Sequence, residues 1–154
     1  KDLLPHLSVP TEYRAIVNAH FRIVPPAGAP LMLGVIGGTA EWIFSFPDRV
    51  SVTISAAEAL VDEDREVLAG RIWGDIARAL KIDGPMPPWQ IVKEKRATFA
   101  ATPAQDALRP GPRGPIRNIF LAGDWTQTGL PATIEGAIRS GETAARLAIR
   151  HLNL

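Results

Sequence analysis

The chain has 154 residues, and its 17 lysines and arginines against 16 acidic residues give a formal net charge of +1. This balance argues against a protein that binds nucleic acid through a basic face. Without cysteine there can be no disulfide, thiolate metal site or cysteine nucleophile, and three scattered histidines do not suggest zinc, so we expect no metal centre. No apolar run approaches the roughly 18 residues of a membrane-spanning helix, and no leader-like segment opens the chain. Because the first residue is Lys1, we expect these residues to be part of a longer protein.

The first part of the chain predicts an antiparallel sheet. Residues 13–24 alternate between an apolar face and a mixed face, which is the pattern of a strand with one side in a core. Further strands are predicted over 31–36, 41–46 and 50–54, joined by short turns that contain glycine or proline. Such short connections favour an antiparallel meander.

A helix is predicted over 62–80, where apolar residues recur at helical spacing after Asp62, a residue type that can cap a helix. The helix would cover one face of the meander. A further strand is predicted over 90–100. The segment 103–117 holds four prolines and predicts a linker.

Three arginines of this linker have two readings. Arg109, Arg113 and Arg117 could attract an anion, or they could be loop charges in solvent, which is the commoner case. The spacing of these residues does not decide between the two.

The closing segment has a different pattern. Residues 118–122 are a continuous apolar run, which suits a strand buried on both faces, and a helix is predicted over 132–150. Strand, loop and helix form half of a βα unit, and ligands of such sheets gather at the carboxyl ends of the strands. Asp124 would lie at that end.

Several residues here could bind a cofactor. Gly123 has no side chain and permits a close approach, and Asp124 could accept a hydrogen bond from a ribose or ribityl hydroxyl. Free N–H groups near Thr133 and Ile134 would favour negative charge, such as develops at N1 and O2 of a reduced flavin. Alternatively, Asp124 only caps the TQTG loop and Thr133 only caps the helix.

Small residues line the predicted helix at every fourth position. They form two stripes: Gly136, Ser140 and Ala144, and Ala137, Gly141 and Ala145. Glycines weaken an isolated helix by roughly 1 kcal/mol each, so we expect a tightly packed partner. Because no partner is obvious in these residues, we expect the helix to face an absent domain and, in this chain alone, to mediate a dimer; the alternative is that it folds back onto the chain's own sheet.

The order Gly123-Asp124, Glu135-Gly136-Ala137, Ser140-Gly141 resembles the carboxyl-terminal FAD-binding motif of the flavin-containing amine oxidase and phytoene desaturase superfamily. Within it, residues 16–22, 93–103 and 121–137 resemble the squalene-associated FAD-dependent desaturases (hydroxysqualene dehydroxylases). The resemblance implies that Asp124 contacts the ribityl chain of FAD and that the backbone from Ala132 to Ile134 contacts the pyrimidine end of the ring.

The same resemblance implies an oxidoreductase that removes the hydroxyl of hydroxysqualene to give squalene in hopanoid synthesis. The alternatives are a phytoene or carotenoid-type desaturase, an amine oxidase and, from another class, a non-catalytic α+β binding module. Thr133 stands where amine oxidases usually carry an aromatic residue, which favours an isoprenoid lipid over an amine. A cytoplasmic location, with peripheral association of the complete protein at the inner face of the membrane, is expected.

The superfamily also begins with a Gly-x-Gly-x-x-Gly loop, and this chain departs from that pattern. Residues 34–38 (GVIGG) have the wrong spacing, and residues 111–114 (GPRG) follow no predicted strand. We therefore expect only the carboxyl-terminal portion, inactive alone and dependent on a missing amino-terminal FAD-binding half.

Asn18 and His20 share the mixed face of the first strand. This face could line a cavity beside the flavin, with His20 donating a proton to a leaving hydroxyl or orienting it, or both could be ordinary half-buried residues. Nearby apolar residues could line such a cavity or form the core: Leu31, Met32, Leu33, Trp42, Ile43, Phe44 and Phe46.

Together these observations predict an α+β chain. Residues 1–102 would form an antiparallel sheet with its covering helix, 103–117 the linker, and 118–154 the last strand and helix of a Rossmann-like FAD domain.

Overall fold

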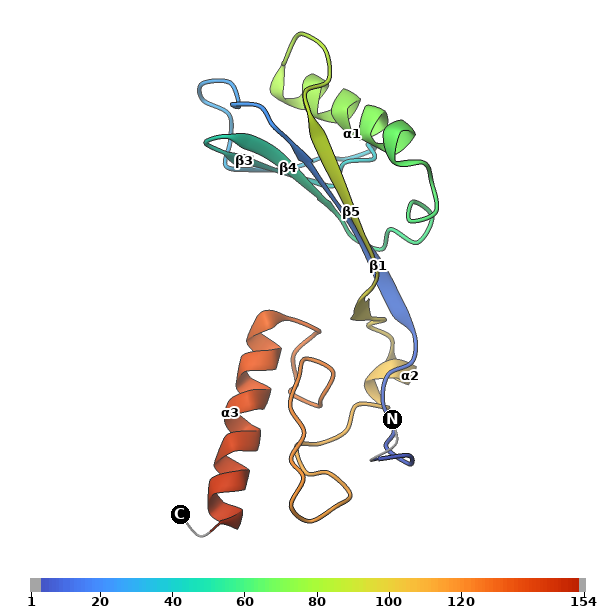
Figure 1. Ribbon diagram of the computed structural model, residues 1–154, viewed down its shortest axis with the longest axis vertical. Helices are drawn as coiled ribbons and strands as arrows, with labels where there is room; N and C mark the ends of the chain where they lie inside the picture. The colour runs from blue at the N-terminus through green and yellow to red at the C-terminus, as the bar shows by residue number, and fades with distance from the viewer. Residues whose placement is uncertain (1–3, 153–154) are drawn as a thin grey trace. The chain divides into compact units, whose positions relative to one another are not determined.

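The computed structural model describes residues 4–152 (Figure 1). Along the chain it contains β1 (Tyr13–Phe21), β2 (Met32–Gly34), β3 (Trp42–Phe46), β4 (Arg49–Ile54), α1 (Arg65–Leu80), β5 (Trp89–Phe99), α2 (Pro103–Asp106) and α3 (Ile134–His151). Two compact units are present. One is Arg14–Ala97, and the other consists of the chain before and after it.

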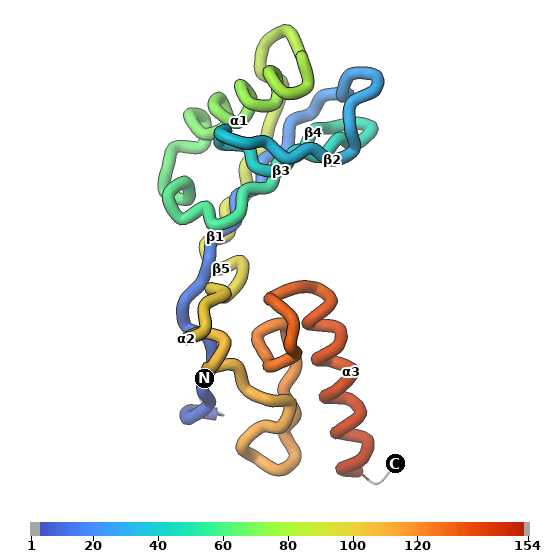
Figure 2. The backbone as a smooth tube through the Cα atoms, turned by 180° about the vertical axis from the view of Figure 1, so that it is seen from behind, coloured from blue at the N-terminus to red at the C-terminus, as the bar shows by residue number. Residues whose placement is uncertain are grey.

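The strands of the first unit form one sheet in the order β2-β3-β4-β1-β5. The pairs β2–β3, β3–β4 and β4–β1 are antiparallel, so the predicted antiparallel sheet is confirmed. The predicted meander holds only for β2, β3 and β4, because β1 lies beside β4 and not beside β2. Figure 2 shows β2 and β3 lying side by side next to β4. The strand predicted over 13–24 ends earlier, at Phe21, before the two prolines that follow.

The alternating pattern of β1 decides which face is buried. Ala15, Val17, Ala19 and Phe21 are buried, whereas the residues between them are half-buried or exposed. The buried face packs against α1, and the Phe21 and Trp73 ring centroids are 5.5 Å apart. The opposite face of the sheet therefore carries the mixed residues.

The predicted covering helix is confirmed, but its start is not where Asp62 would place it. α1 begins at Arg65, and the Asp64 side chain accepts hydrogen bonds from the backbone N–H groups of Glu66 and Val67. Asp62 instead pairs with Lys95 at 2.7 Å. Asp64 is the cap because its side chain alone is in reach of the free N–H groups of the first turn.

The second unit contains α2, a long loop and α3. The strand predicted over 118–122 is wrong: Phe120 makes only an isolated antiparallel bridge with Arg113, and Ala122 is exposed. A buried strand requires paired neighbours on both sides, whereas in the described part of the chain this segment pairs on one side only, with residues 112–114. The predicted linker contains the short helix α2, capped by Thr102.

The helix predicted over 132–150 is confirmed as α3, which begins after Thr133. Between residues 4 and 152, no helix is both long and apolar enough to cross a membrane.

Candidate functional site

Gly123 adopts a backbone conformation that favours glycine. Its φ is +137°, and a Cβ atom at this position would lie 2.3 Å from Nε1 of Trp125. The close approach predicted for Gly123 is therefore made, in this chain, by the indole of Trp125. A side chain at position 123 would meet both backbone strain and this clash.

Ser140 joins the loop to α3. Its Oγ accepts the N–H of Gly123 at 3.0 Å and lies 2.6 Å from Oγ1 of Thr126, which itself bonds the carbonyl of Gly123 at 2.8 Å. Thr126 and Ser140 are buried. The Gly-Asp turn is thus fixed to the middle of α3 by a closed set of hydrogen bonds.

The loop after the turn is fixed by Arg109. Its Nη2 donates to the Asp124 carbonyl at 3.1 Å, the Thr126 carbonyl at 2.5 Å and the Thr128 hydroxyl at 3.1 Å. Its Nη1 pairs with Asp106 at 2.9 Å, and only 4% of the side chain is exposed. The interpretation of Arg109 as a loop charge in solvent is therefore wrong; its guanidinium binds the Asp106 carboxylate and the loop carbonyls instead.

Arg113 and Arg117 are exposed, as loop charges in solvent would be. Arg109 differs because it can satisfy several carbonyl groups that a loop leaves unpaired. Its Nε is buried and has no hydrogen-bond partner among the described residues.

Asp124 is half-buried, and no hydrogen bond to its carboxylate is found within residues 4–152. The alternative that its side chain caps the TQTG loop is therefore wrong, because Arg109 stabilises that loop instead. The carboxylate remains available to an external hydroxyl.

Thr133 does cap α3: its Oγ1 accepts the N–H of Gly136 at 3.1 Å. The N–H groups of Ile134 and Glu135 have no acceptor in the part of the chain described. An exposed helix start with free N–H groups attracts negative charge.

The small-residue stripe Gly136, Ser140 and Ala144 is buried on its own chain. A Cβ at position 136 would lie 3.1 Å from the Pro131 carbonyl oxygen. The loop that precedes α3 covers this stripe, and the sequence did not suggest that loop as its partner. Gly123 and Thr133 contact α3 one turn apart, about 6 Å along its axis.

The second stripe is different. A Cβ added to Gly141 would meet no atom within 4 Å, and Ala145 is exposed. Large apolar residues continue this open face toward both ends of α3: Ile134, Ile138, Ile149 and Leu152.

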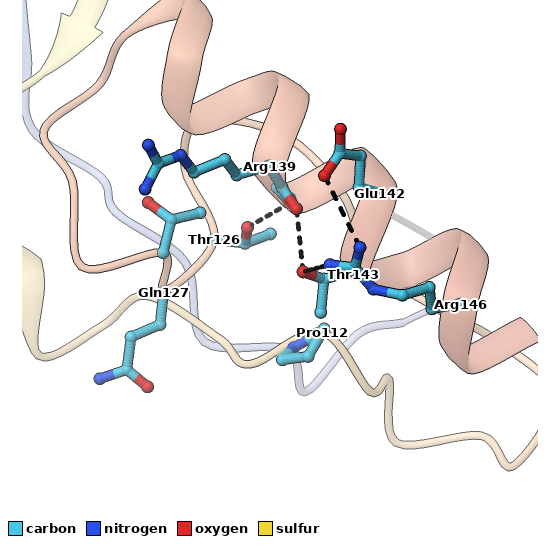
Figure 3. Close-up of a pocket in the computed structure, with 9 residues that line it drawn as sticks. Pro112, Thr126, Gln127, Arg139, Glu142, Thr143 and Arg146 are labelled. Carbon is cyan, nitrogen blue, oxygen red and sulfur yellow. Dashed lines mark hydrogen bonds and ion pairs between the residues drawn. The ribbon is translucent and has the colours of Figure 1, made fainter.

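A pocket of about 350 Å³ lies between α3 and the loop (Figure 3). Arg139, Thr143 and Arg146 line it from the helix, and Pro112 and Thr126 line it from the other side. Both arginines are paired within α3, with Glu135 and Glu142 respectively. None of the residues expected to contact a flavin lines this pocket.

In the sheet unit, Asn18 and His20 lie on the face opposite α1, each bonded across to β4. The Thr53 hydroxyl donates to Oδ1 of Asn18 at 2.8 Å, and Nδ1 of His20 lies 2.9 Å from Oγ of Ser51. Either atom of the His20–Ser51 pair can be the donor, because the tautomer of the imidazole determines whether Nδ1 donates or accepts.

Strand register extends these two pairs into two rows across the sheet. One row runs Met32, Phe44, Ser51, His20, and the next runs Gly34, Trp42, Thr53, Asn18. Met32 and Trp42 are exposed and Phe44 is half-buried, so each row has polar residues on one side and an aromatic residue beside them. Ile43 and Leu33 belong instead to the core under α1.

A pocket of about 430 Å³ lies at the His20 end of this face. Arg22, Arg49 and Gln90 also line it. No group of three or more potential metal ligands is found among residues 4–152.

Comparison with known proteins places the chain in a family. The model described as flavin containing amine oxidoreductase matches residues 11–149, and the chain belongs to this family. The resemblance noted from the Gly-Asp and Glu-Gly-Ala motifs is thereby confirmed. The family is that of flavin-containing amine oxidoreductases.

The chain is also similar to hydroxysqualene dehydroxylases. It is 63% identical over 148 residues to that of Rhodopseudomonas palustris, covering 96% of this chain and 35% of the relative. With that of Sinorhizobium fredii it is 60% identical over 151 residues, which is 98% of this chain and 36% of the relative. The 15-cis-phytoene desaturase of Synechococcus elongatus is 39% identical over 61 residues, 40% of this chain and 13% of that protein. The chain thus spans about 35% of the length of the hydroxysqualene dehydroxylases that it matches.

Proposed function

We propose that this chain is the carboxyl-terminal part of an FAD-dependent oxidoreductase that converts hydroxysqualene to squalene in hopanoid synthesis. The observation that carries the proposal is the 63% identity to a hydroxysqualene dehydroxylase over 96% of the chain. The phytoene desaturases match a shorter stretch at lower identity, and they remain the second candidate class. Alone, without a Gly-x-Gly-x-x-Gly loop, the chain is inactive.

Two observations in the second unit support FAD as the cofactor. The Asp124 carboxylate has no hydrogen-bond partner among the described residues, and it would accept a hydroxyl of the ribityl chain. The backbone from Ala132 to Ile134 would face the pyrimidine end of the ring, where the N–H groups of Ile134 and Glu135 are free at the start of α3. Residues 118–152 would then belong to a Rossmann-like FAD domain of the complete protein.

The chemistry is a reductive dehydroxylation. A carbon–oxygen bond breaks and a carbon–hydrogen bond forms, so the reaction consumes one hydride and one proton and releases water. Bound FAD, once reduced by an electron donor, supplies the hydride. This chain would supply the proton.

His20 is the residue that we assign to that proton. In its protonated form, His20 would donate Nδ1–H to Oγ of Ser51 and Nε2–H to the substrate hydroxyl, which departs as water and leaves a neutral imidazole. Asn18, fixed by Thr53, would orient the same hydroxyl through its amide. The apolar ends of the two rows, at Met32, Trp42 and Phe44, would contact the isoprenoid chain.

The proposal is tested on the complete protein that contains this chain. Purified with FAD and incubated anaerobically with hydroxysqualene and a chemical reductant, it should produce squalene, measured by mass spectrometry. His20→Gln should lower kcat by about a hundredfold or more, the usual effect of losing a general acid. His6→Gln is the control, because His6 is exposed.

Desaturation of phytoene without dehydroxylation would favour the second class and overturn the first. If the complete protein binds no flavin, the non-catalytic binding module becomes the favoured class. If the His20→Gln variant forms squalene at the native rate, the proposed activity holds but His20 is not the proton donor.

A further inference from the structure

We propose that Arg109 is a positioning residue for the flavin site, acting through the loop that carries Asp124. This inference rests on the proposed function. It begins from the unusual surroundings of the side chain, which is buried although it comes from a segment rich in proline and glycine.

The contacts of Arg109 are concentrated on one segment. A single nitrogen, Nη2, donates to acceptors of residues 124, 126 and 128, every second residue of the loop. One of these acceptors is the backbone carbonyl of Asp124 itself. Displacement of the guanidinium would therefore release the backbone that determines where the Asp124 carboxylate lies.

Arg109 is in turn held from the other side. Nη1 pairs with Asp106 at 2.9 Å, and the guanidinium carbon lies 5.0 Å from the centroid of the Phe99 ring. A planar group with several fixed donors suits this arrangement better than a lysine ammonium, which is a single point of charge. A lysine could pair with Asp106 but could not reach all three loop acceptors in the same geometry.

The Nε atom takes no part in these contacts. It is buried and has no hydrogen-bond partner among the described residues. The orientation of the guanidinium is therefore set by the contacts of its two terminal nitrogens, with Asp106 on one side and the loop acceptors on the other.

The experiment uses the complete protein and compares Arg109→Lys and Arg109→Gln with Arg117→Gln. Arg117 is exposed and lies in the same segment, so its variant controls for the loss of one positive charge. FAD affinity is measured by fluorescence titration. Visible circular dichroism of the bound flavin reports its surroundings, and the melting temperature of the apoprotein reports the fold.

The inference predicts that both Arg109 variants bind FAD at least about tenfold more weakly, the effect of losing one or two hydrogen bonds to a charged donor. The visible dichroism of the residual complex should change as well. Arg117→Gln should match the unaltered protein in both measurements. Arg109 variants that melt earlier but bind FAD with native affinity and native dichroism would overturn the inference, because the role would then be in folding alone.

If both Arg109 variants fail to fold, Thr128→Val decides. It removes one acceptor of Nη2, together with the hydrogen bonds between the Thr128 hydroxyl and the Leu130 backbone, and leaves the arginine in place. FAD affinity should fall severalfold, and unchanged affinity would overturn the inference. FAD binding by the unaltered complete protein is measured before any variant is compared. If that protein binds no FAD, the proposed function fails, whatever the variants do.

Discussion

Ser140, in the middle of α3, accepts the backbone N–H of Gly123 at 3.0 Å. This hydrogen bond joins two elements of the family motif that are 17 residues apart in the sequence. It also explains why one stripe of α3 consists of small residues: a longer side chain would separate the turn at Gly123 from the helix. Two glycines on the same helix can therefore be expected to respond in opposite ways to substitution.

We expect Gly136→Ala to destabilise the chain and Gly141→Ala to stabilise it. A Cβ at position 136 meets the Pro131 carbonyl oxygen at 3.1 Å, whereas at position 141 it meets nothing within 4 Å. In open space the helix gains roughly 1 kcal/mol when alanine replaces glycine. Urea denaturation measures both changes. A stability loss from Gly141→Ala in the complete protein would show that another part of that protein covers this face.

Ala144→Arg should lower the melting temperature by several degrees, because Ala144 is only 8% exposed and a charged side chain there has no partner. Ala145→Arg, on the open face, should leave the melting temperature unchanged. If the chain forms a dimer through α3, sedimentation should show the dimer lost in Ala145→Arg alone. An Ala144→Arg variant of native stability would contradict the burial of the first stripe.

Two neighbouring aspartates test the start of α1. Asp64→Ala should cost about 1 kcal/mol of unfolding free energy, because it removes the side chain that accepts two N–H groups of the first turn. Asp62→Ala should cost much less, since it removes only an exposed ion pair. Chemical denaturation of the two variants compares them directly, and equal losses would argue that Asp62 contributes to the helix start.

The same pair has a small pH dependence. A hydrogen bond and the charge of Lys95 lower the pKa of the Asp62 carboxyl. The pair therefore contributes above the ordinary aspartate pKa of about 4 and loses that contribution as the pH falls through the lowered value. Asp62→Asn should therefore lower the free energy of unfolding slightly at neutral pH, leave it unchanged at acid pH below the lowered pKa, and so flatten the acid side of the stability profile.

In the complete protein, Asp124→Ala should retain the fold and bind FAD more weakly. Losing one hydrogen bond to a sugar hydroxyl costs on the order of 1 kcal/mol, which is severalfold in affinity. The ratio of flavin to protein absorbance after gel filtration measures retention. If the Asp124→Ala protein retains as much FAD as the unaltered protein, Asp124 does not contact the flavin. Its side chain would then have no assigned role, because it does not cap the loop either.

The 154-residue chain alone should bind FAD weakly or not at all. It lacks the Gly-x-Gly-x-x-Gly loop that would hold the pyrophosphate, so only the ribityl and pyrimidine contacts remain. Flavin fluorescence titration is sufficient to test this. A stoichiometric complex of submicromolar affinity would mean that these residues bind the cofactor without the pyrophosphate loop.

Local patterns predicted much of the sheet unit. Alternation in β1 places Val17 and Ala19 in the core and Asn18 and His20 on the other face because side chains of any strand alternate with a period of two residues. Short turns between strands similarly require antiparallel pairing. The resemblance to the flavoenzyme superfamily also came from residues close together in sequence.

Tertiary structure decided what depends on distant partners. The run at 118–122 has the composition of a buried strand, but strands exist only when paired, and its one bridge is to Arg113. Arg109 is indistinguishable in sequence from Arg113 and Arg117, and it is buried because carbonyls 15 to 17 residues away need a donor. The stripe on α3 indicated a close partner without identifying it, because small residues permit any backbone to approach. Only the folded chain, with Gly123 bonded to Ser140, shows that the partner is the preceding loop.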